Sequence, residues 1–167
     1  MTLLALSITI LLLALLAYRA FQRALRVDRF KSRFQSLYPP SETVTWLARP
    51  GQRPLLAHLY KPSGWHHTDQ RPCIVLFFGG AWRVGSAWQF APFAQRLCAL
   101  GAVVVLPEYR IKSRDRSTVD EAVADGFAVM NTVRESADCL GIDLARISVG
   151  GGSAGGHLAA WIATARH

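Results

Sequence analysis

The order of apolar and polar positions divides the chain into an apolar N-terminal run and a body in which strand-like and helix-like segments alternate. Residues 42–48 and 55–60 alternate apolar and polar side chains around a Pro-Gly pair at 50–51, which predicts two antiparallel edge strands. Residues 73–78 and 102–106 are continuous apolar runs, typical of strands buried on both faces. A third, shorter strand is predicted at 147–149.

Helices are predicted after each of these three strands. Ser86 can cap a helix whose stripe includes Phe90, Phe93, Ala94, Leu97 and Leu100, and Gly101 ends it. A longer helix is predicted from a capping box at Ser117 or Thr118 as far as Gly141, and a final apolar helix follows the glycine run after residue 149. Alternation of strand and helix predicts an α/β fold with a mostly parallel sheet and flanking helices.

The N-terminal run predicts a membrane anchor. Residues 3–18 are sixteen uncharged residues, and a helix extended over residues 1–21 comes near the ~30 Å thickness of the hydrocarbon core. We therefore predict a transmembrane helix at 1–21 that contacts the membrane through residues 3–21, and a basic linker at 22–41. Because the basic residues follow the apolar run, the positive-inside rule predicts a single-pass protein whose folded part, residues 42–167, is cytoplasmic.

Composition excludes several classes of protein. Of 167 residues, 51% are hydrophobic and 18% charged, which excludes a disordered chain. Three dispersed cysteines without a Cys-x-x-Cys pair exclude a disulfide framework and a zinc ribbon, and they are expected to be buried free thiols. The net charge of +8 is concentrated at residues 19–33, so it does not indicate nucleic-acid binding. We predict no cofactor and no metal site.

Candidate chemistry centres on a Gly-x-Ser-x-Gly pattern formed by Gly151, Ser153 and Gly155, between a predicted strand and a predicted helix. This is the context of a nucleophile elbow, in which a sharp turn exposes the serine Oγ and only very small neighbours let the backbone pass. Small residues could instead serve only to pack the helix on the sheet. The glycines also match a dinucleotide-binding fingerprint, but the acidic residue expected about 20 positions later is missing from the sequence.

A second motif, Gly79-Gly80-Ala81-Trp82, ends the first buried strand, and Glu108-Tyr109-Arg110 follows the next one. With the elbow at 151–156, the chain resembles the α/β-hydrolase fold, in the acetyl esterase and lipase-like family related to hormone-sensitive lipase, over residues 42–167. That family carries a glycine-rich oxyanion loop, an Asp-Tyr-Arg-like turn and Gly-x-Ser-Ala-Gly-Gly in this order.

The resemblance implies a carboxylesterase that cleaves a small-molecule acyl ester. It makes Ser153 the catalytic nucleophile, and it makes the N–H groups of Gly80, Ala81 and Ala154 the oxyanion hole. Phe78 replaces the histidine that braces the loop in the family, and Ala81 replaces a third glycine, which demands an ordinary backbone conformation there. Glu108 and Arg110 are expected either to form an internal ion pair that supports the loop or to cap a surface turn.

The general base and its orienting acid are missing. In this fold both follow the serine, yet only His157 and His167 do so, and no acid follows. His157 is expected to be a packing or hydrogen-bonding residue, and His58, His66 and His67 are expected to be exposed. We therefore expect a hydrolase truncated after the elbow helix and inactive as this chain; the alternative is a non-catalytic remnant or binding module that keeps the fold.

Overall fold

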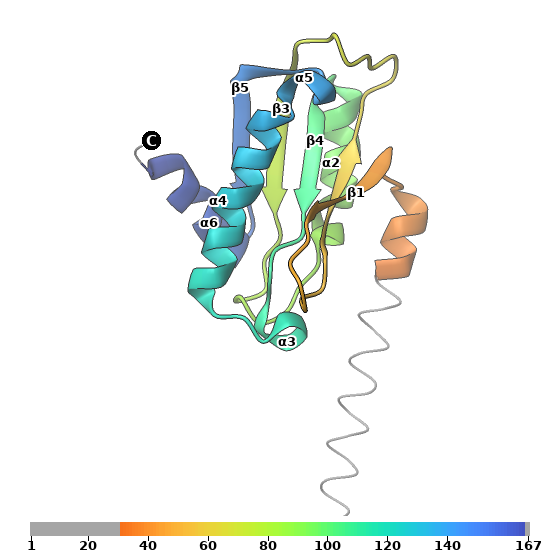
Figure 1. Cartoon of the computed structure of the whole chain (residues 1–167). Coiled ribbons are helices and arrows are strands. Elements are labelled where there is room, and N and C mark those ends of the chain that lie inside the picture. Colours follow the sequence, from red (N-terminus) through yellow and green to blue (C-terminus); the bar gives the residue numbers. More distant parts are fainter. Residues whose placement is uncertain (1–30, 166–167) are drawn as a thin grey trace, which may run out of the picture. The chain divides into compact units, whose positions relative to one another are not determined.

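The structure, a computed structural model, describes residues 31–165 (Figure 1). Residues 31–37 are helical and belong to one compact unit, whereas the chain from Tyr38 onward forms another. The anchor predicted at 1–21 lies outside the described residues. Among the helices of residues 31–165, none is both long and apolar enough to cross a membrane.

A five-stranded mixed sheet forms the centre of the second unit (Figure 1). Its strands are β1 (Glu42–Leu47), β2 (Leu55–Tyr60), β3 (Arg71–Phe77), β4 (Val103–Pro107) and β5 (Ile142–Gly151). Their order in the sheet is β1-β2-β4-β3-β5. The β3 strand pairs in parallel with β4 and with β5, whereas β2 pairs antiparallel with β1 and with β4. The sheet is therefore mixed, and the prediction of a mostly parallel sheet holds only for its β4-β3-β5 part.

Helices cover both faces of this sheet, with α4 in front of it and α2 behind it in Figure 1. The helical elements are η1 (Ala87–Phe90), α2 (Ala91–Ala99), α3 (Lys112–Asp115), α4 (Val119–Glu135), α5 (Ala137–Leu140) and α6 (Ala154–Thr164). The capping box of α4 uses Thr118 and Glu121, one of the two predicted pairs. This arrangement places the carboxyl ends of β3, β4 and β5, and the loops that follow them, at one edge of the sheet.

The structure corrects several predicted boundaries. Ser86 caps the short turn η1, and α2 begins separately at Ala91. The side chains of Phe93 and Leu100 are exposed, because α2 packs on the sheet through small residues such as Ala91 and Ala94. The long helix ends at Glu135, and Gly141 ends only the short α5. The third predicted strand is longer than 147–149, because β3 pairs with it from Ile142.

The core is centred on β4, whose five residues are all buried. His58 also lies in the core, with its ring centroid 4.2 Å from that of Trp88 and its Nδ1 3.0 Å from Thr43 Oγ1. The expectation that His58 is exposed was therefore wrong, because β2 is covered on the side that the histidine faces. His66 and His67 are exposed as expected.

The three cysteines are free, but they are not all buried. Cys73 is buried in β3, Cys98 is partly buried, and Cys139 is exposed on α5. Burial raises the pKa of the Cys73 thiol to about 12. The prediction of buried thiols therefore holds only for Cys73, since apolar neighbours in sequence do not decide whether an element covers the side chain.

Candidate active site

Ser153 lies in the tight turn between β5 and α6, and its side chain is exposed. Its backbone has φ 51° and ψ −118°, a conformation that non-glycine residues rarely adopt. Two backbone hydrogen bonds hold the turn: Gly152 N–H donates to Phe77 O at 3.2 Å, and His157 N–H donates to Ser153 O at 2.9 Å. The turn therefore has the strained geometry that a nucleophile elbow requires.

The glycines on either side of Ser153 are needed because other backbone passes against them. A Cβ on Gly151 would lie 2.5 Å from the carbonyl oxygens of Phe77 and Gly155. A Cβ on Gly155 would overlap the carbonyl oxygens of Phe77 and Phe78. The steric reason for the Gly-x-Ser-x-Gly pattern is thus present in the structure, and the end of β3 is the backbone that imposes it.

The glycine-rich loop that follows β3, residues 79–85, packs directly against this turn. A Cβ on Gly79 would lie 2.6 Å from Gly152 O and 3.3 Å from Ser153 Cβ. The loop is closed by Gly80 O, which accepts hydrogen bonds from Arg83 N–H and Val84 N–H, each at 3.0 Å. The fold therefore brings Gly79 against Gly152, which lies 73 positions later in the sequence.

The backbone of this loop differs from the prediction at Ala81. Ala81 has φ 53° and Trp82 has φ 62°, so both adopt the left-handed region in place of the ordinary conformation expected for an alanine. The loop after β4 holds them there, because Lys112 N–H donates to Trp82 O and Ser113 N–H donates to Arg83 O, each at 3.0 Å. Tertiary hydrogen bonds therefore offset the conformational strain at Ala81 and Trp82.

Backbone donors are available where the two motifs meet. Within residues 31–165, no acceptor is hydrogen-bonded to the amide N–H groups of Gly80, Ala81 or Ala154. Ala154 is the first residue of α6, so its N–H also belongs to the positive end of the helix dipole. This edge of the sheet can therefore bind a negatively charged oxygen through backbone N–H groups.

Gln89 braces the loop, and the sequence analysis did not identify it. Its side-chain amide makes two hydrogen bonds with one residue: Gly79 N–H donates to Gln89 Oε1 at 3.1 Å, and Gln89 Nε2 donates to Gly79 O at 3.2 Å. The short turn η1, capped by Ser86, positions this side chain. No local sequence signal distinguishes Gln89 from any other exposed glutamine.

Phe78 takes part in a second brace, on the buried side of the loop. Its ring stacks on Tyr109 with centroids 4.2 Å apart, and the Tyr109 hydroxyl donates to Phe78 O at 2.7 Å. Tyr109 is completely buried, and this burial raises the pKa of its hydroxyl far above the usual range. The loop thus has an aromatic support at the position where the family pattern has a histidine.

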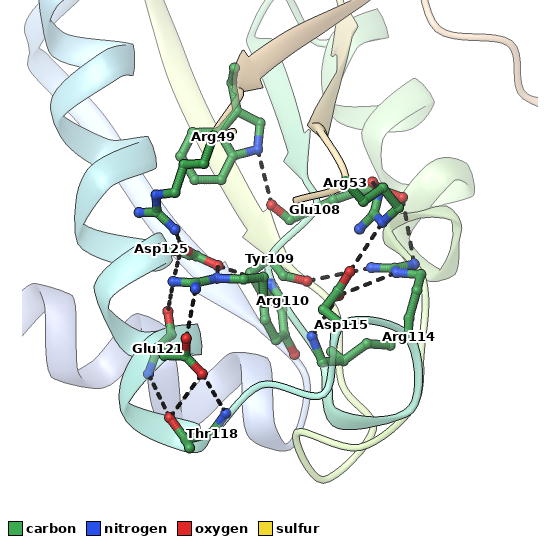
Figure 2. A network of polar contacts seen from close by, with 12 residues as sticks. Arg49, Arg53, Glu108, Tyr109, Arg110, Arg114, Asp115, Thr118, Glu121 and Asp125 are labelled. Carbon is green, nitrogen blue, oxygen red and sulfur yellow. Dashed lines mark hydrogen bonds and ion pairs between the residues drawn. The ribbon is translucent and has the colours of Figure 1, made fainter. Parts of the chain in front are cut away.

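Arg110 does not pair with Glu108, contrary to the expectation of an ion pair between them. Instead its guanidinium donates to the completely buried carboxylate of Asp125 on α4, from Nε and Nη2, each at 2.8 Å (Figure 2). Arg110 N–H donates to the same carboxylate at 3.0 Å, and Arg110 Nη1 lies 2.8 Å from Glu121 Oε1. The hydrogen bond to Asp125 is the largest cause that raises the pKa of Arg110.

Glu108 pairs with a different arginine, Arg53, in the segment between β1 and β2 (Figure 2). Arg53 Nη1 donates to Glu108 Oε2 at 2.6 Å, and Arg53 Nε donates to Asp115 Oδ1 at 3.1 Å. Glu108 and Arg110 therefore connect the loop after β4 to two different elements. This network anchors the same loop that donates hydrogen bonds to Trp82 and Arg83.

The histidine nearest to Ser153 along the chain, His157, is exposed on the first turn of α6. Its ring lies edge-on between Trp82 and Trp161, with centroid distances of 5.9 and 5.7 Å. It is a packing residue, as predicted. In the part of the chain that the structure describes, no side chain is hydrogen-bonded to Ser153 Oγ.

Comparison with known proteins agrees with this geometry. The BD-FAE family matches residues 58–167, a segment that includes both motifs. An AB hydrolase superfamily protein of Schizosaccharomyces pombe is 34% identical over 105 residues, which cover 62% of this chain and 30% of that protein. Carboxylesterase NlhH of Mycobacterium tuberculosis is 36% identical over 97 residues, 57% of this chain and 30% of the relative. The matched segments thus span about a third of these relatives.

Solved structures show the same fold. The butyrate-bound esterase Est2 of Thermogutta terrifontis matches with a TM-score of 0.71 and 39% identity, and the match covers 74% of this chain and 44% of the esterase chain. The same esterase phosphorylated by paraoxon has a TM-score of 0.71 and 38% identity, with 74% and 47% covered. The chain belongs to the BD-FAE family of esterase-like α/β hydrolases.

Proposed function

We propose that this chain supplies the nucleophile and the oxyanion hole of a carboxylesterase that acts on small acyl esters. The observation that carries the proposal is the strained, exposed Ser153 at the β5–α6 turn, with the loop of Gly80 and Ala81 packed beside it. Membership of an esterase-like family supports the same reaction class. We propose no cofactor, because acyl transfer needs only a serine hydroxyl, a general base and N–H donors for the oxyanion.

The proposed reaction proceeds through an ester of Ser153. Its Oγ attacks the substrate carbonyl carbon while the hydroxyl proton passes to a base, and the carbonyl oxygen becomes an oxyanion. N–H groups of Gly80, Ala81 and Ala154 donate to that oxyanion. Collapse of the tetrahedral intermediate expels the alcohol, which takes up a proton, and water then hydrolyses the acyl-serine. Removing one donor from such a site costs about 10²–10³ in kcat.

The base is the component that the described residues do not supply at Ser153. We therefore propose that the chain by itself reacts slowly at Ser153 and does not turn over ester. A small base in solution, such as imidazole, should partly replace the side chain and accelerate the first step. Acceleration by imidazole would distinguish a chain with a reactive Ser153 that lacks only a base from a chain of the same fold in which Ser153 is not reactive.

The test is covalent labelling of the full chain with a fluorophosphonate probe, with the modified residue mapped by mass spectrometry. Paraoxon phosphorylates the Thermogutta esterase named above, so organophosphorus reagents suit the comparison. Labelling is expected at Ser153, faster with imidazole and absent in Ser153→Ala. Ser148→Ala, which changes an exposed serine on β5, is the matched control and should label normally.

Two results would contradict the proposal. Equal labelling of wild-type chain and Ser153→Ala would show that the probe reacts elsewhere. No labelling of a folded sample in the presence of imidazole would support the alternative, a non-catalytic module with this fold.

We also propose that residues 3–21 anchor the protein to a membrane, with the esterase part on the cytoplasmic side. The support is the uncharged run followed by basic residues in the sequence. Deletion of residues 1–30 should move the protein from the membrane fraction to the supernatant. If the intact chain is already in the supernatant, the anchor proposal is wrong.

A further inference from the structure

A pocket of about 480 Å³ lies beside the proposed oxyanion loop. Its wall includes Ala81 and Trp82 from the loop after β3, and residues of the loop after β4 and of the start of α4. Trp82 also contacts the His157 ring on the first turn after Ser153. The pocket is therefore adjacent to the serine turn, where a part of a bound ester outside the reacting carbonyl could lie.

Three basic side chains line this pocket, and no acidic residue does. They are Arg83 from the loop after β3, and Lys112 and Arg116 from α3 and its C-cap. Within residues 31–165, none of the three forms an ion pair. Three like charges around one hollow repel one another, and an anion between them would relieve that repulsion.

The two acidic residues nearest in sequence do not neutralise these charges. Asp115 is bonded to Arg53 and to the N–H of Ile111, so its carboxylate is directed to the network of Figure 2. Asp120 is exposed on the first turn of α4 and is not part of the pocket wall. The positive charge of the pocket is therefore not balanced locally.

Ser117 provides an independent observation. It lines the pocket and is 7% exposed, and no other group in the described part of the chain is hydrogen-bonded to its buried Oγ. A buried hydroxyl without a partner is unfavourable, and an acceptor in the pocket would satisfy it. The wall therefore combines three cations with one hydroxyl donor.

We propose that this pocket binds an anionic group of the substrate, so that the preferred ester carries a carboxylate or a phosphate besides the scissile bond. That the anion belongs to an ester substrate rests on the proposed esterase function. The binding test below does not depend on that function. Hydrogen bonds fix the backbone that carries two of these cations: Lys112 N–H donates to Trp82 O, and Arg116 N–H donates to Lys112 O, each at 3.0 Å. The side chains can therefore be changed without removing these hydrogen bonds.

The test is equilibrium binding to the full chain carrying Ser153→Ala, so that no probe is consumed. Monomethyl glutarate, which has one carboxylate, is compared with the neutral dimethyl glutarate, and the amide NMR signals of residues 81–84 are followed. The half ester is expected to bind about tenfold more tightly, a difference equivalent to about 1.4 kcal/mol. The advantage should decrease as salt is added, because the cations are exposed.

Variants identify the groups responsible. Arg83→Gln should reduce the preference for the half ester, and Arg83→Gln combined with Lys112→Gln should abolish it. Arg96→Gln on α2, which matches the single variant in loss of charge, should keep the preference. Ser117→Ala should weaken binding of the half ester and should not lower the midpoint of thermal unfolding, because it removes an unsatisfied hydroxyl. Competition by inorganic phosphate and by acetate then distinguishes a phosphate from a carboxylate as the better ligand.

Equal affinity of the two glutarates for the parent chain would overturn the proposal. So would a preference that survives in the Arg83→Gln/Lys112→Gln variant as fully as in Arg96→Gln. Neither result depends on whether Ser153 reacts with a fluorophosphonate, so failure of the anion pocket and failure of the esterase proposal are separate outcomes.

Discussion

Replacing Asp125 by alanine should destabilise the fold more than any exposed acidic substitution. The Asp125 carboxylate is completely buried and accepts three hydrogen bonds from Arg110, at 2.8, 2.8 and 3.0 Å, and one from Arg49 at 3.3 Å. Without it, the guanidinium of Arg110 remains largely buried, with 11% of its side chain exposed, and within residues 31–165 it keeps an ion pair only with Glu121. The change therefore leaves a buried charge poorly compensated.

Removing one partner of a buried ion pair costs about 3–5 kcal/mol. Because Glu121 still contacts Arg110 and is 45% exposed, we expect the lower end, about 3 kcal/mol. At about 4 °C per kcal/mol for a domain of this size, the midpoint of thermal unfolding should fall by about 12 °C. Urea unfolding should give the same loss of free energy with an unchanged slope.

Asp120→Ala on the same helix is the matched control. Asp120 is exposed on the first turn of α4 and should contribute less than about 1 kcal/mol through the helix dipole. A double-mutant cycle with Arg110→Ala should give a coupling free energy above about 1 kcal/mol, since the two side chains are in direct contact. If Asp125→Ala is no more destabilising than Asp120→Ala, or if the cycle shows no coupling, the contact between Arg110 and Asp125 does not stabilise the fold.

Three further predictions concern the elbow, the thiols and pH. Gly155→Ala should lower both the unfolding midpoint and Ser153 labelling, because its Cβ would overlap two carbonyl oxygens, and normal labelling in a stable variant would contradict this. At pH 8 the exposed Cys139 should react rapidly with a thiol reagent, and Cys139→Ser should remove this fast phase. Cys73 should react only on unfolding, because it is buried and burial raises its pKa to about 12. The hydrogen bond from Thr118 N–H lowers the pKa of Glu121 below its ordinary value of 4.5. The ionised Glu121 therefore contributes to stability above pH 4.5, and this contribution is lost as pH falls through the lower pKa of the folded state. Glu121→Gln should flatten the stability profile in that acid range, whereas an unchanged profile would show that Glu121 contributes nothing there.

The serine turn and the buried strands could be predicted from the sequence because their signals are local. A strand that turns into a helix within four residues brings Gly151 against Gly155, because a Cβ on Gly151 would lie 2.5 Å from the Gly155 carbonyl oxygen, and the end of β3 adds a second close contact at both positions. Likewise, the continuous apolar run predicted at 102–106 corresponds to the covered strand β4 at Val103–Pro107, and the Thr118–Glu121 box joins residues three apart. These elements were predicted correctly because the physics that forms them acts over a few residues.

What the sequence could not determine is which distant group each polar side chain meets. Glu108 and Arg110 are two residues apart, yet they bind Arg53 and Asp125, 55 and 15 positions away. Gln89 and His58 have ordinary sequence contexts. The position of η1 places the Gln89 side chain against Gly79, and packing against β2 buries His58. Ala81 adopts a left-handed backbone because the loop after β4 supplies Lys112 N–H to the neighbouring carbonyl. Local sterics determine where the chain turns, whereas the tertiary fold decides partners, because hydrogen bonds and charges act across whatever surfaces the fold brings into contact.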